Sequence, residues 1–454
     1  MCGWWKPSEN NQKNKLILNF LKSSISLFIG NLTIAVSSLL LGILTARFLE
    51  PSGKGELYLV LQIMSIGAIF LSVGISPAYQ YFISKKKIPE QKIVSHIFFQ
   101  ICIITLILVG LYFIHEFILA ILDINNISHL FVLISFFGII LNITNLFATS
   151  VVLTKKNGIR FHSFLSAFGS VLNLVFLVIF ALTDFLDFNT AILSYFIGLF
   201  VQIIPKIYVI LLKVKIVFLP DWQAITRELF KYAGPSFLTN LSVILVFKLD
   251  TFIIGEIRGL EALGIYSMAV AFAEITLMLP NSVGTVLFTK IPTSNETEKL
   301  ELLKIVNKIL VSLALGIAVL LILASPYFVE ILLGKAYRDS IIPLQILAPG
   351  LVFMSANYVF TNYYTGSGYP KVTAKVYAIG IVINIVCNYY FIDLWGINGA
   401  ALASTLTYFL IAVIFYLLIK KKLSISFTEL FIMNIHDYRE SYAQILGLIN
   451  MKKP

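Results

Sequence analysis

Charged residues are scarce in this chain: Asp, Glu, Lys and Arg make up 13% of its 454 residues. Apolar residues make up 58%, and the mean hydropathy is +0.90. A soluble fold with this composition would lack the polar surface needed to cover its core. The composition therefore argues against a water-soluble protein and indicates a chain whose solvent is mostly lipid.

Cysteine and the common catalytic signatures are also scarce. Cys2, Cys102 and Cys387 are odd in number and far apart, so neither a disulfide framework nor a metal cluster is expected. The sequence contains no Gly-x-x-x-x-Gly-Lys-Ser/Thr phosphate loop, no His-Glu-x-x-His and no Gly-x-Ser-x-Gly. We therefore expect no catalytic residues, no cofactor and no metal site, and we expect that the protein is not an enzyme.

Long apolar runs fill most of the chain, and each is close to the ~20 residues with which a helix crosses the hydrocarbon layer. They predict an all-α integral membrane protein with about twelve transmembrane helices. The predicted spans are 18–46, 56–82, 93–114, 128–153, 161–183, 190–212, 229–255, 262–288, 304–325, 340–365, 372–392 and 397–419.

The net charge of +11 is distributed unevenly between the loops. Lysines gather in alternate short loops, such as 85–87, 155–156 and 420–422, while the intervening loops are mainly acidic. This is the pattern of the positive-inside rule, so we expect both termini to be cytoplasmic and the protein to lie in the cytoplasmic (inner) membrane. We expect an uncleaved N-terminus and no binding of nucleic acid.

The chain repeats itself. Phe28-Ile-Gly-Asn31-Leu-Thr33 returns as Phe237-Leu-Thr-Asn240-Leu-Ser242, and Gly55-Glu-Leu-Tyr58 is answered by Gly264-Ile-Tyr266 with one residue missing. Six spans in each half is an even number, so the second copy enters the membrane from the same side as the first. We predict two parallel six-helix repeats, a construction common in transporters.

The repeat also suggests domain boundaries. We predict an N-terminal six-helix lobe (1–213), a cytoplasmic linker (214–231), a C-terminal six-helix lobe (232–423) and a cytoplasmic tail (424–454). The tail is expected to be a short interfacial helix or a loose segment.

Polar side chains recur at helical spacing inside the spans. In the second span they share one helix face, and the first span has a sparser stripe that includes Asn31. Small polar residues also hold membrane helices together, so for the serines packing is a full alternative to a water-filled passage. The residues on the second-span face are Tyr58, Gln62, Ser65, Ser72, Ser76 and Tyr79.

Three ionisable residues fall deep within the predicted seventh and eighth spans: Lys248, Asp250 and Glu274. Each charge at such a depth costs on the order of 3 kcal/mol, so these groups should face an aqueous cavity or one another. Lys248 and Asp250 are two positions apart and project to different sides of a regular helix, so ion pairing with other spans or snorkelling remains an alternative. For Glu274 we favour a role in responding to protons or cations.

Several short motifs together resemble the polysaccharide-biosynthesis exporters of the MATE-like (MOP) superfamily. Each motif is weak alone, but their order and spacing extend over nearly the whole chain. They are Arg47-Phe-Leu-Glu-Pro51-Ser-Gly53-Lys-Gly55-Glu-Leu-Tyr58, Gly255 to Tyr266 with Asp250 before it, Gly334-Lys-Ala-Tyr337, Ile346-Leu-Ala-Pro-Gly350 and Gly396-Ile-Asn-Gly399-Ala-Ala-Leu-Ala403.

The resemblance implies two lobes in a V-shaped MATE-like bundle and a Wzx-type flippase. Its substrate would be an undecaprenyl-diphosphate-linked oligosaccharide, an O-antigen or capsule repeat unit, moved from the inner to the outer leaflet. We expect Arg47 and Lys248 to attract phosphate, and Glu274 and Asp250 to couple transport to protons or sodium. The residues expected to contact sugar or line the passage are Tyr58, Gln62, Tyr79, Gln80, Asn31 and Asn240.

Other functions stay open at this point. A multidrug or organic-cation antiporter of the same fold would use a cavity dominated by acidic groups. A membrane glycan polymerase is a further alternative, although the short outer loops count against it. The expected partners are the lipid bilayer, the lipid-linked oligosaccharide, a proton or sodium ion and the glycan polymerase machinery.

Overall fold

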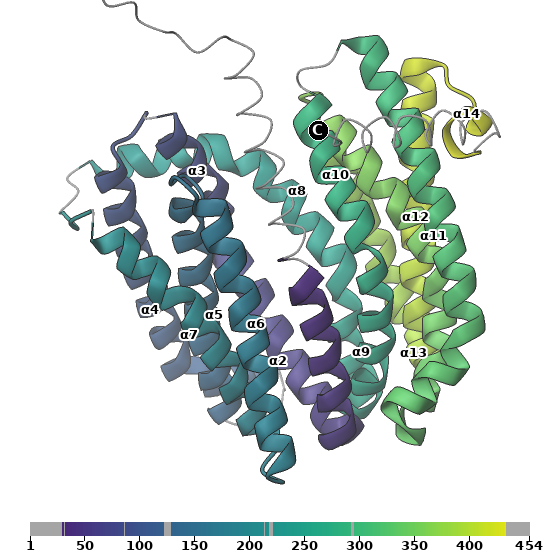
Figure 1. The fold of residues 1–454 in the computed structure, drawn as a ribbon, viewed down its shortest axis with the longest axis horizontal. Helices are drawn as coiled ribbons and strands as arrows, with labels where there is room; N and C mark the ends of the chain where they lie inside the picture. Colours follow the sequence, from purple (N-terminus) through teal and green to yellow (C-terminus); the bar gives the residue numbers. More distant parts are fainter. Residues whose placement is uncertain are drawn as a thin grey trace, which may run out of the picture. The chain divides into compact units, whose positions relative to one another are not determined.

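The computed structural model describes residues 30, 32–85, 87–121, 129–212, 214–217, 221–291 and 295–432. Every regular element in these residues is a helix (Figure 1). The chain order is a helix at Leu32–Phe48, α2 (Glu50–Leu71), α3 (Ile75–Ser84), α4 (Glu90–Ile121), α5 (His129–Val152), α6 (Gly158–Leu182), α7 (Phe188–Leu211), α8 (Trp222–Ile257), α9 (Gly259–Thr276), α10 (Met278–Lys290), α11 (Glu296–Leu333), η2 (Lys335–Ser340), α12 (Ile341–Gly366), α13 (Pro370–Leu423) and α14 (Phe427–Phe431).

The helices account for the predicted spans. Within the described residues, eight helices are long and apolar enough to cross a membrane. The helix Leu32–Phe48, α8 and the α9–α10 pair correspond to three more spans, and α13 contains two spans separated by a kink at Gly396. Because α13 is one of the eight helices and contributes a second span, the total is the twelve spans expected. The protein is therefore an all-α, multi-pass membrane protein.

Two predicted spans are interrupted rather than continuous. The second is divided into α2 and α3, because Val73 (φ 47°) and Gly74 (φ 64°) adopt left-handed backbone conformations between them. The polar residues from Tyr58 to Tyr79 therefore do not share one uninterrupted helix face. The eighth span is divided at Leu277, where α9 gives way to α10 three residues before Pro280.

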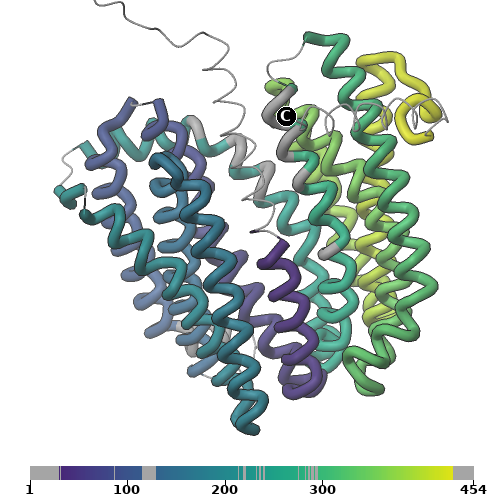
Figure 2. The backbone as a smooth tube through the Cα atoms, viewed as in Figure 1, coloured from purple at the N-terminus to yellow at the C-terminus, as the bar shows by residue number. Residues whose placement is uncertain are grey.

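The chain forms two compact units that do not follow the predicted lobe boundaries. The first unit contains residues 1–48 and 60–237, and the second contains residues 49–59 and 238–454. The chain passes from one unit to the other just before α2, again within α2, and finally within α8. In the second unit, α11, α12 and α13 run side by side (Figures 1 and 2).

In the first unit, α6 and α7 approach each other closely through two glycines. A Cβ added to Gly169 would lie 2.5 Å from the carbonyl oxygen of Gly198, which leaves no room for a side chain at that position. Such small-residue contacts allow the backbones of membrane helices to approach closely.

The start of α8 also packs in the first unit. Asp221 and Lys92 form an ion pair of 2.5 Å. The imidazole of His96 stacks on Trp222, with ring centroids 3.9 Å apart, and its Nε2 atom is 2.9 Å from the hydroxyl of Thr226. In its described part, the predicted linker 214–231 is thus attached to the first unit through these α4 contacts.

The second unit has a close contact between the start of α2 and α9. A Cβ on Gly55 would lie 1.7 Å from the carbonyl oxygen of Leu260, and a Cβ on Gly264 would lie 1.7 Å from that of Pro51. Gly55 and Gly264 are the repeat-related glycines of the sequence. Glycines at related positions of the two repeats therefore form the two sides of this helix contact.

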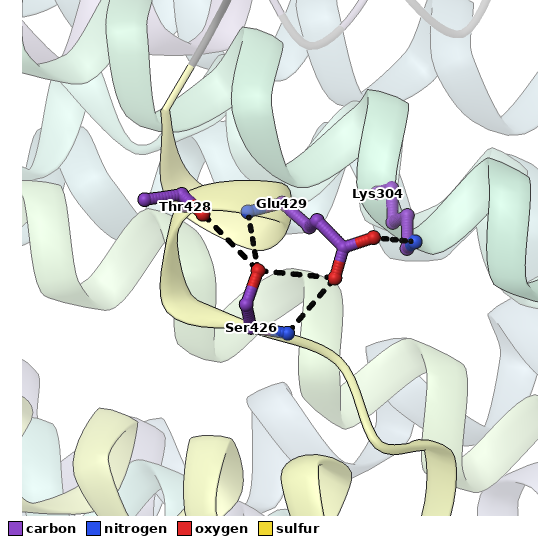
Figure 3. Close-up of polar contacts among 4 residues, drawn as sticks. All are labelled: Lys304, Ser426, Thr428 and Glu429. Atoms are coloured by element: carbon purple, nitrogen blue, oxygen red, sulfur yellow. Dashed lines mark hydrogen bonds and ion pairs between the residues drawn. The ribbon is translucent and has the colours of Figure 1, made fainter.

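The chain after α13 folds back onto α11. Ser424 takes a left-handed conformation (φ 54°), and Ser426 then caps α14 by accepting a hydrogen bond from the backbone N–H of Glu429. Glu429 in turn pairs with Lys304 at 2.9 Å (Figure 3). The described part of the predicted tail is thus a short helix, and residues 433–454 lie outside the described chain.

Candidate functional site: an ion pair in a cavity

Lys248 of α8 and Glu274 of α9 form an ion pair in the second unit. The Lys248 ammonium donates a hydrogen bond of 2.7 Å to the Glu274 carboxylate. The Lys248 side chain is 18% exposed and that of Glu274 is 42% exposed. The tight turn at Gly259 (φ 81°) sends α9 back along α8, and this reversal brings together two residues 26 positions apart.

Asp250 projects to another side of α8 and is buried. Its carboxylate accepts hydrogen bonds from the Tyr266 hydroxyl at 2.6 Å and from the Ser404 hydroxyl at 3.2 Å. The backbone N–H of Thr251 donates a third bond of 2.8 Å. These donors replace water around the carboxylate, which makes its burial tolerable.

Tyr58 lies beside Lys248. The Lys248 ammonium is 5.9 Å from the centre of the Tyr58 ring, within the range of a cation–π interaction. Tyr58 is in the first turns of α2, which belong to the second unit. Lys248 therefore has an anionic partner and an aromatic partner, and both come from helices other than its own.

A cavity of about 300 Å³ opens beside this ion pair. Its volume is at the lower end of the range of ligand-binding pockets. The wall combines the two charged groups with aromatic and aliphatic side chains, so it offers both polar and apolar contacts to a ligand. The lining residues are Val243, Ile244, Phe247, Lys248, Glu274, Leu277, Met278, Asn281 and Tyr358.

Three further predicted site residues are not part of this cluster. Arg47 is exposed near the end of the helix Leu32–Phe48, Gln62 is half-buried in α2, and Gln80 is exposed in α3. All three belong to the first unit. Asn31 and the side chain of Asn240 lie outside the described residues.

Tyr79 occupies the core of the first unit. It is 0% exposed, and its hydroxyl is 2.8 Å from Nδ1 of His96 and donates to the side-chain oxygen of Gln100. Its ring also packs edge-on against Phe147. In this structure, therefore, Tyr79 stabilises the packing of α3 on α4 and α5 and is not accessible to a sugar.

Three residues of the cluster were not predicted from the sequence. Tyr266 and Ser404 hold Asp250, and Tyr358 of α12 lines the cavity. Tyr266 had a detectable signal, because it lies in the Gly255–Tyr266 motif, 16 positions after Asp250 across a glycine turn. Ser404 and Tyr358 are distant in sequence and gave no such signal.

Comparison with protein families identifies the chain. The family model described as polysaccharide biosynthesis protein matches residues 20–297, and the MatE model matches residues 235–390. This chain belongs to the polysaccharide biosynthesis protein family. The resemblance to polysaccharide exporters of the MATE-like superfamily is thereby confirmed.

Individual relatives agree with this family. An uncharacterized membrane protein of Methanocaldococcus jannaschii is 28% identical over 89% of this chain and 99% of its own length. The probable flippase AglR of Haloferax volcanii is 27% identical over 42% of this chain and 41% of its own length. Among solved structures, the lipid II flippase MurJ matches with a TM-score of 0.71 at 16% identity, covering 87% of each chain. This likeness confirms the predicted MATE-like fold.

Proposed function

We propose that this protein is a flippase for a lipid-linked oligosaccharide. The cargo is an O-antigen or capsule repeat unit on undecaprenyl diphosphate, moved from the inner to the outer leaflet by alternating access. The Lys248–Glu274 pair in the wall of a cavity is the observation that carries the proposal. Membership in the polysaccharide biosynthesis family and the names of AglR and MurJ support it.

The substrate requires such a cavity because its head is strongly polar. Sugar hydroxyls and a diphosphate lose water on entering hydrocarbon, and this loss is costly unless other polar groups replace the water. Lys248 supplies a cation that binds phosphate oxygens in charge-assisted hydrogen bonds. Tyr58, Tyr358 and Asn281 supply aromatic and amide groups for sugar. Arg47, Gln62 and Gln80 of the first unit remain candidates for further contacts with the substrate.

The ion pair also suggests how transport is coupled to an ion. An arriving phosphate competes with Glu274 for Lys248, and Glu274 then loses its cationic partner. A carboxylate left alone at this depth costs on the order of 3 kcal/mol, and it avoids that cost by taking up a proton or sodium ion. Release of the substrate restores the pair and expels the ion, so cargo and ion cross in the same direction. An ion gradient directed from the inner to the outer side therefore favours flipping.

Asp250 is a second candidate for ion coupling, but its position is less favourable. It does not line the cavity, and three donors already satisfy its carboxylate. A proton or sodium ion reaching it must first displace Tyr266 or Ser404. We therefore assign the primary coupling role to Glu274 and expect Asp250 to respond more slowly.

A cation antiporter of the same fold is the alternative, favoured by the MatE match and by the carboxylate in the cavity. Lys248 counts against it, because its charge offsets that of Glu274. The balance of charges also leads us to expect a neutral or weakly acidic glycan rather than a strongly acidic one. We further propose that the protein lies in the cytoplasmic membrane with both termini in the cytoplasm, and that it works with the glycan polymerase machinery.

Deletion of the gene followed by analysis of lipid-linked sugars tests the proposal. We expect an undecaprenyl-bound repeat unit to accumulate on the inner leaflet. The wild-type chain and the exposed-lysine control Lys421→Gln should clear it, whereas Lys248→Gln should not. Sensitivity of the deletion strain to organic cations, without accumulation of the glycan lipid, would favour the antiporter and overturn the flippase.

A further inference from the structure

A second cavity, an apolar groove, lies in the second unit and shares no lining residue with the cavity beside the ion pair. Its volume is about 290 Å³, and its wall is apolar apart from the hydroxyl of Tyr416. Helices α11, α12, α13 and α14 all contribute to it. The lining residues are Val311, Val352, Phe353, Phe409, Ala412, Val413, Tyr416, Phe427, Phe431 and Ile432.

Along α13, the apolar residues that line the groove are followed by a lysine. Phe409, Val413 and Tyr416 are spaced by four and three positions, so they share a helix face, and Lys420 continues this face four residues later. Lys420 is exposed. From Phe409 to Lys420 the helix rises about 16 Å, which is close to half of a ~30 Å hydrocarbon layer.

On the opposite wall, formed by α11, a lysine likewise lies one helical turn from an apolar residue. Val311 of α11 lines the groove, and Lys308 lies three residues earlier on the same face. Both walls therefore change from apolar to cationic at the end nearest α14. This arrangement complements a molecule with an apolar chain and an anionic head.

Helix α14 closes that end and is itself held in place. Phe427 and Phe431 stack with ring centroids 4.7 Å apart, and Phe431 packs edge-on against Tyr416 at 6.0 Å. The side-chain amide of Asn307 donates a hydrogen bond of 2.8 Å to the backbone carbonyl of Leu430. The groove is thus a defined pocket with a fixed wall.

We propose that this groove binds one chain of an anionic membrane phospholipid, with the headgroup phosphate at Lys308 and Lys420. The rise of α13 from Phe409 to Lys420 corresponds to about one leaflet, whereas the undecaprenyl chain of the proposed cargo is much longer than this. The two lysines add a preference for negative charge that an ordinary lipid-facing surface lacks, and each favours an anionic lipid about five-fold, the equivalent of about 1 kcal/mol. The inference does not depend on the flippase proposal.

Native mass spectrometry of the purified full chain, titrated with phosphatidylglycerol or phosphatidylcholine, tests this site. We expect one tightly bound phosphatidylglycerol and weaker phosphatidylcholine. Lys420→Gln should weaken phosphatidylglycerol binding about five-fold. The matched variant Lys421→Gln changes an exposed lysine on another face of the helix and should have little effect.

A second variant tests the chain-binding part of the groove. Val413→Trp fills it and should reduce binding of both lipids, and its thermal unfolding temperature shows whether the fold is kept. Equal affinity for the two phospholipids, equal effects of Lys420→Gln and Lys421→Gln, or undiminished binding in a folded Val413→Trp protein would each overturn the proposal. Displacement of phosphatidylglycerol by equimolar undecaprenyl phosphate would also overturn it, because the groove would then be a cargo site.

Discussion

The ammonium of Lys248 lies 2.7 Å from the carboxylate of Glu274, in the wall of a cavity that contains Phe247 and Tyr358. Each charge makes the other tolerable within a membrane-spanning region. A ligand that binds one of them must therefore change the surroundings of the other. This relationship makes the pair suitable for coupling two binding events.

The coupling between Lys248 and Glu274 can be measured directly. We expect Lys248→Gln and Glu274→Gln each to lower the free energy of unfolding by about 1–2 kcal/mol, because Glu274 is partly exposed and the loss is smaller than for a fully buried pair. The double variant should lose less than the sum of the two, since it leaves no unpaired charge. Denaturant unfolding of the wild type, the two single variants and the double variant gives the coupling energy in a double-mutant cycle. Additive losses would mean that the two side chains do not interact.

Tyr266 should stabilise the fold through Asp250. Tyr266→Phe removes a 2.6 Å hydrogen bond to a buried carboxylate and should cost about 1.5–3 kcal/mol. The matched control is Tyr389→Phe, because the Tyr389 hydroxyl donates to Glu256 at 3.3 Å on the exposed surface. Thermal unfolding of both variants gives the comparison. A loss in Tyr266→Phe no larger than that in the control would contradict the role assigned to Asp250.

The contact between α2 and α9 should tolerate no side chain at Gly264. Gly264→Ala places a methyl group 1.7 Å from the carbonyl oxygen of Pro51, so the helices must separate. We expect a loss of about 3 kcal/mol or more, or failure to fold. Gly316→Ala in α11 is the control, because nothing lies within 4 Å of its added methyl group. This control should be neutral or up to ~1 kcal/mol more stable. Equal stabilities of the two variants would be inconsistent with the close contact.

The docking of α14 should depend on pH only in strongly acidic solution. The backbone N–H of Ser426 and the ammonium of Lys304 lower the pKa of the Glu429 carboxyl to about 2. Since the pKa is lower in the folded state, the contribution is fully present above about pH 4.5, the ordinary value for Glu, and is lost as the pH falls towards 2.

Hydrogen exchange of the α14 amides checks this pH dependence. Protection relative to α13 should remain constant from about pH 7 to pH 5 and fall at lower pH. Glu429→Gln should exchange faster at neutral pH and lose most of this dependence. Loss of protection already between neutral pH and about pH 5 would show that another group controls the docking.

Much of the fold could be predicted because lipid imposes simple rules on sequence. Apolar length gave each of the twelve spans, and the superfamily assignment followed from weak motifs in a fixed order. Local backbone conformation was harder to predict. The break at Val73 and Gly74 lies in an apolar run with no proline before Pro77. By contrast, the kink at Gly396 falls in the predicted gap between spans 372–392 and 397–419, and the two halves of α13 pack on each other, with the Asn384 side chain donating to the Thr407 hydroxyl.

The sequence predicted the ionisable residues of the candidate site but not which of them form pairs. Depth in the membrane identified Lys248, Asp250 and Glu274, and their spacing showed that Lys248 and Asp250 face different ways. The Lys248–Glu274 pair depends on how α9 folds back along α8, which periodicity alone does not specify. For Tyr79 the prediction was wrong. The polar stripe indicated a helix face in contact with water, but the Tyr79 hydroxyl is hydrogen-bonded to His96 and Gln100 within the core.

Transport in proteoliposomes tests the central proposal most directly. The purified chain is reconstituted with an undecaprenyl-diphosphate-linked oligosaccharide, and the fraction accessible to an external glycosidase is followed with and without a proton or sodium gradient. We predict gradient-dependent flipping by the wild-type chain and by Lys421→Gln, flipping without gradient dependence in Glu274→Gln, and no flipping in Lys248→Gln. A wild-type rate equal to that of protein-free liposomes, or unchanged gradient-driven flipping in both Lys248→Gln and Glu274→Gln, would contradict the account.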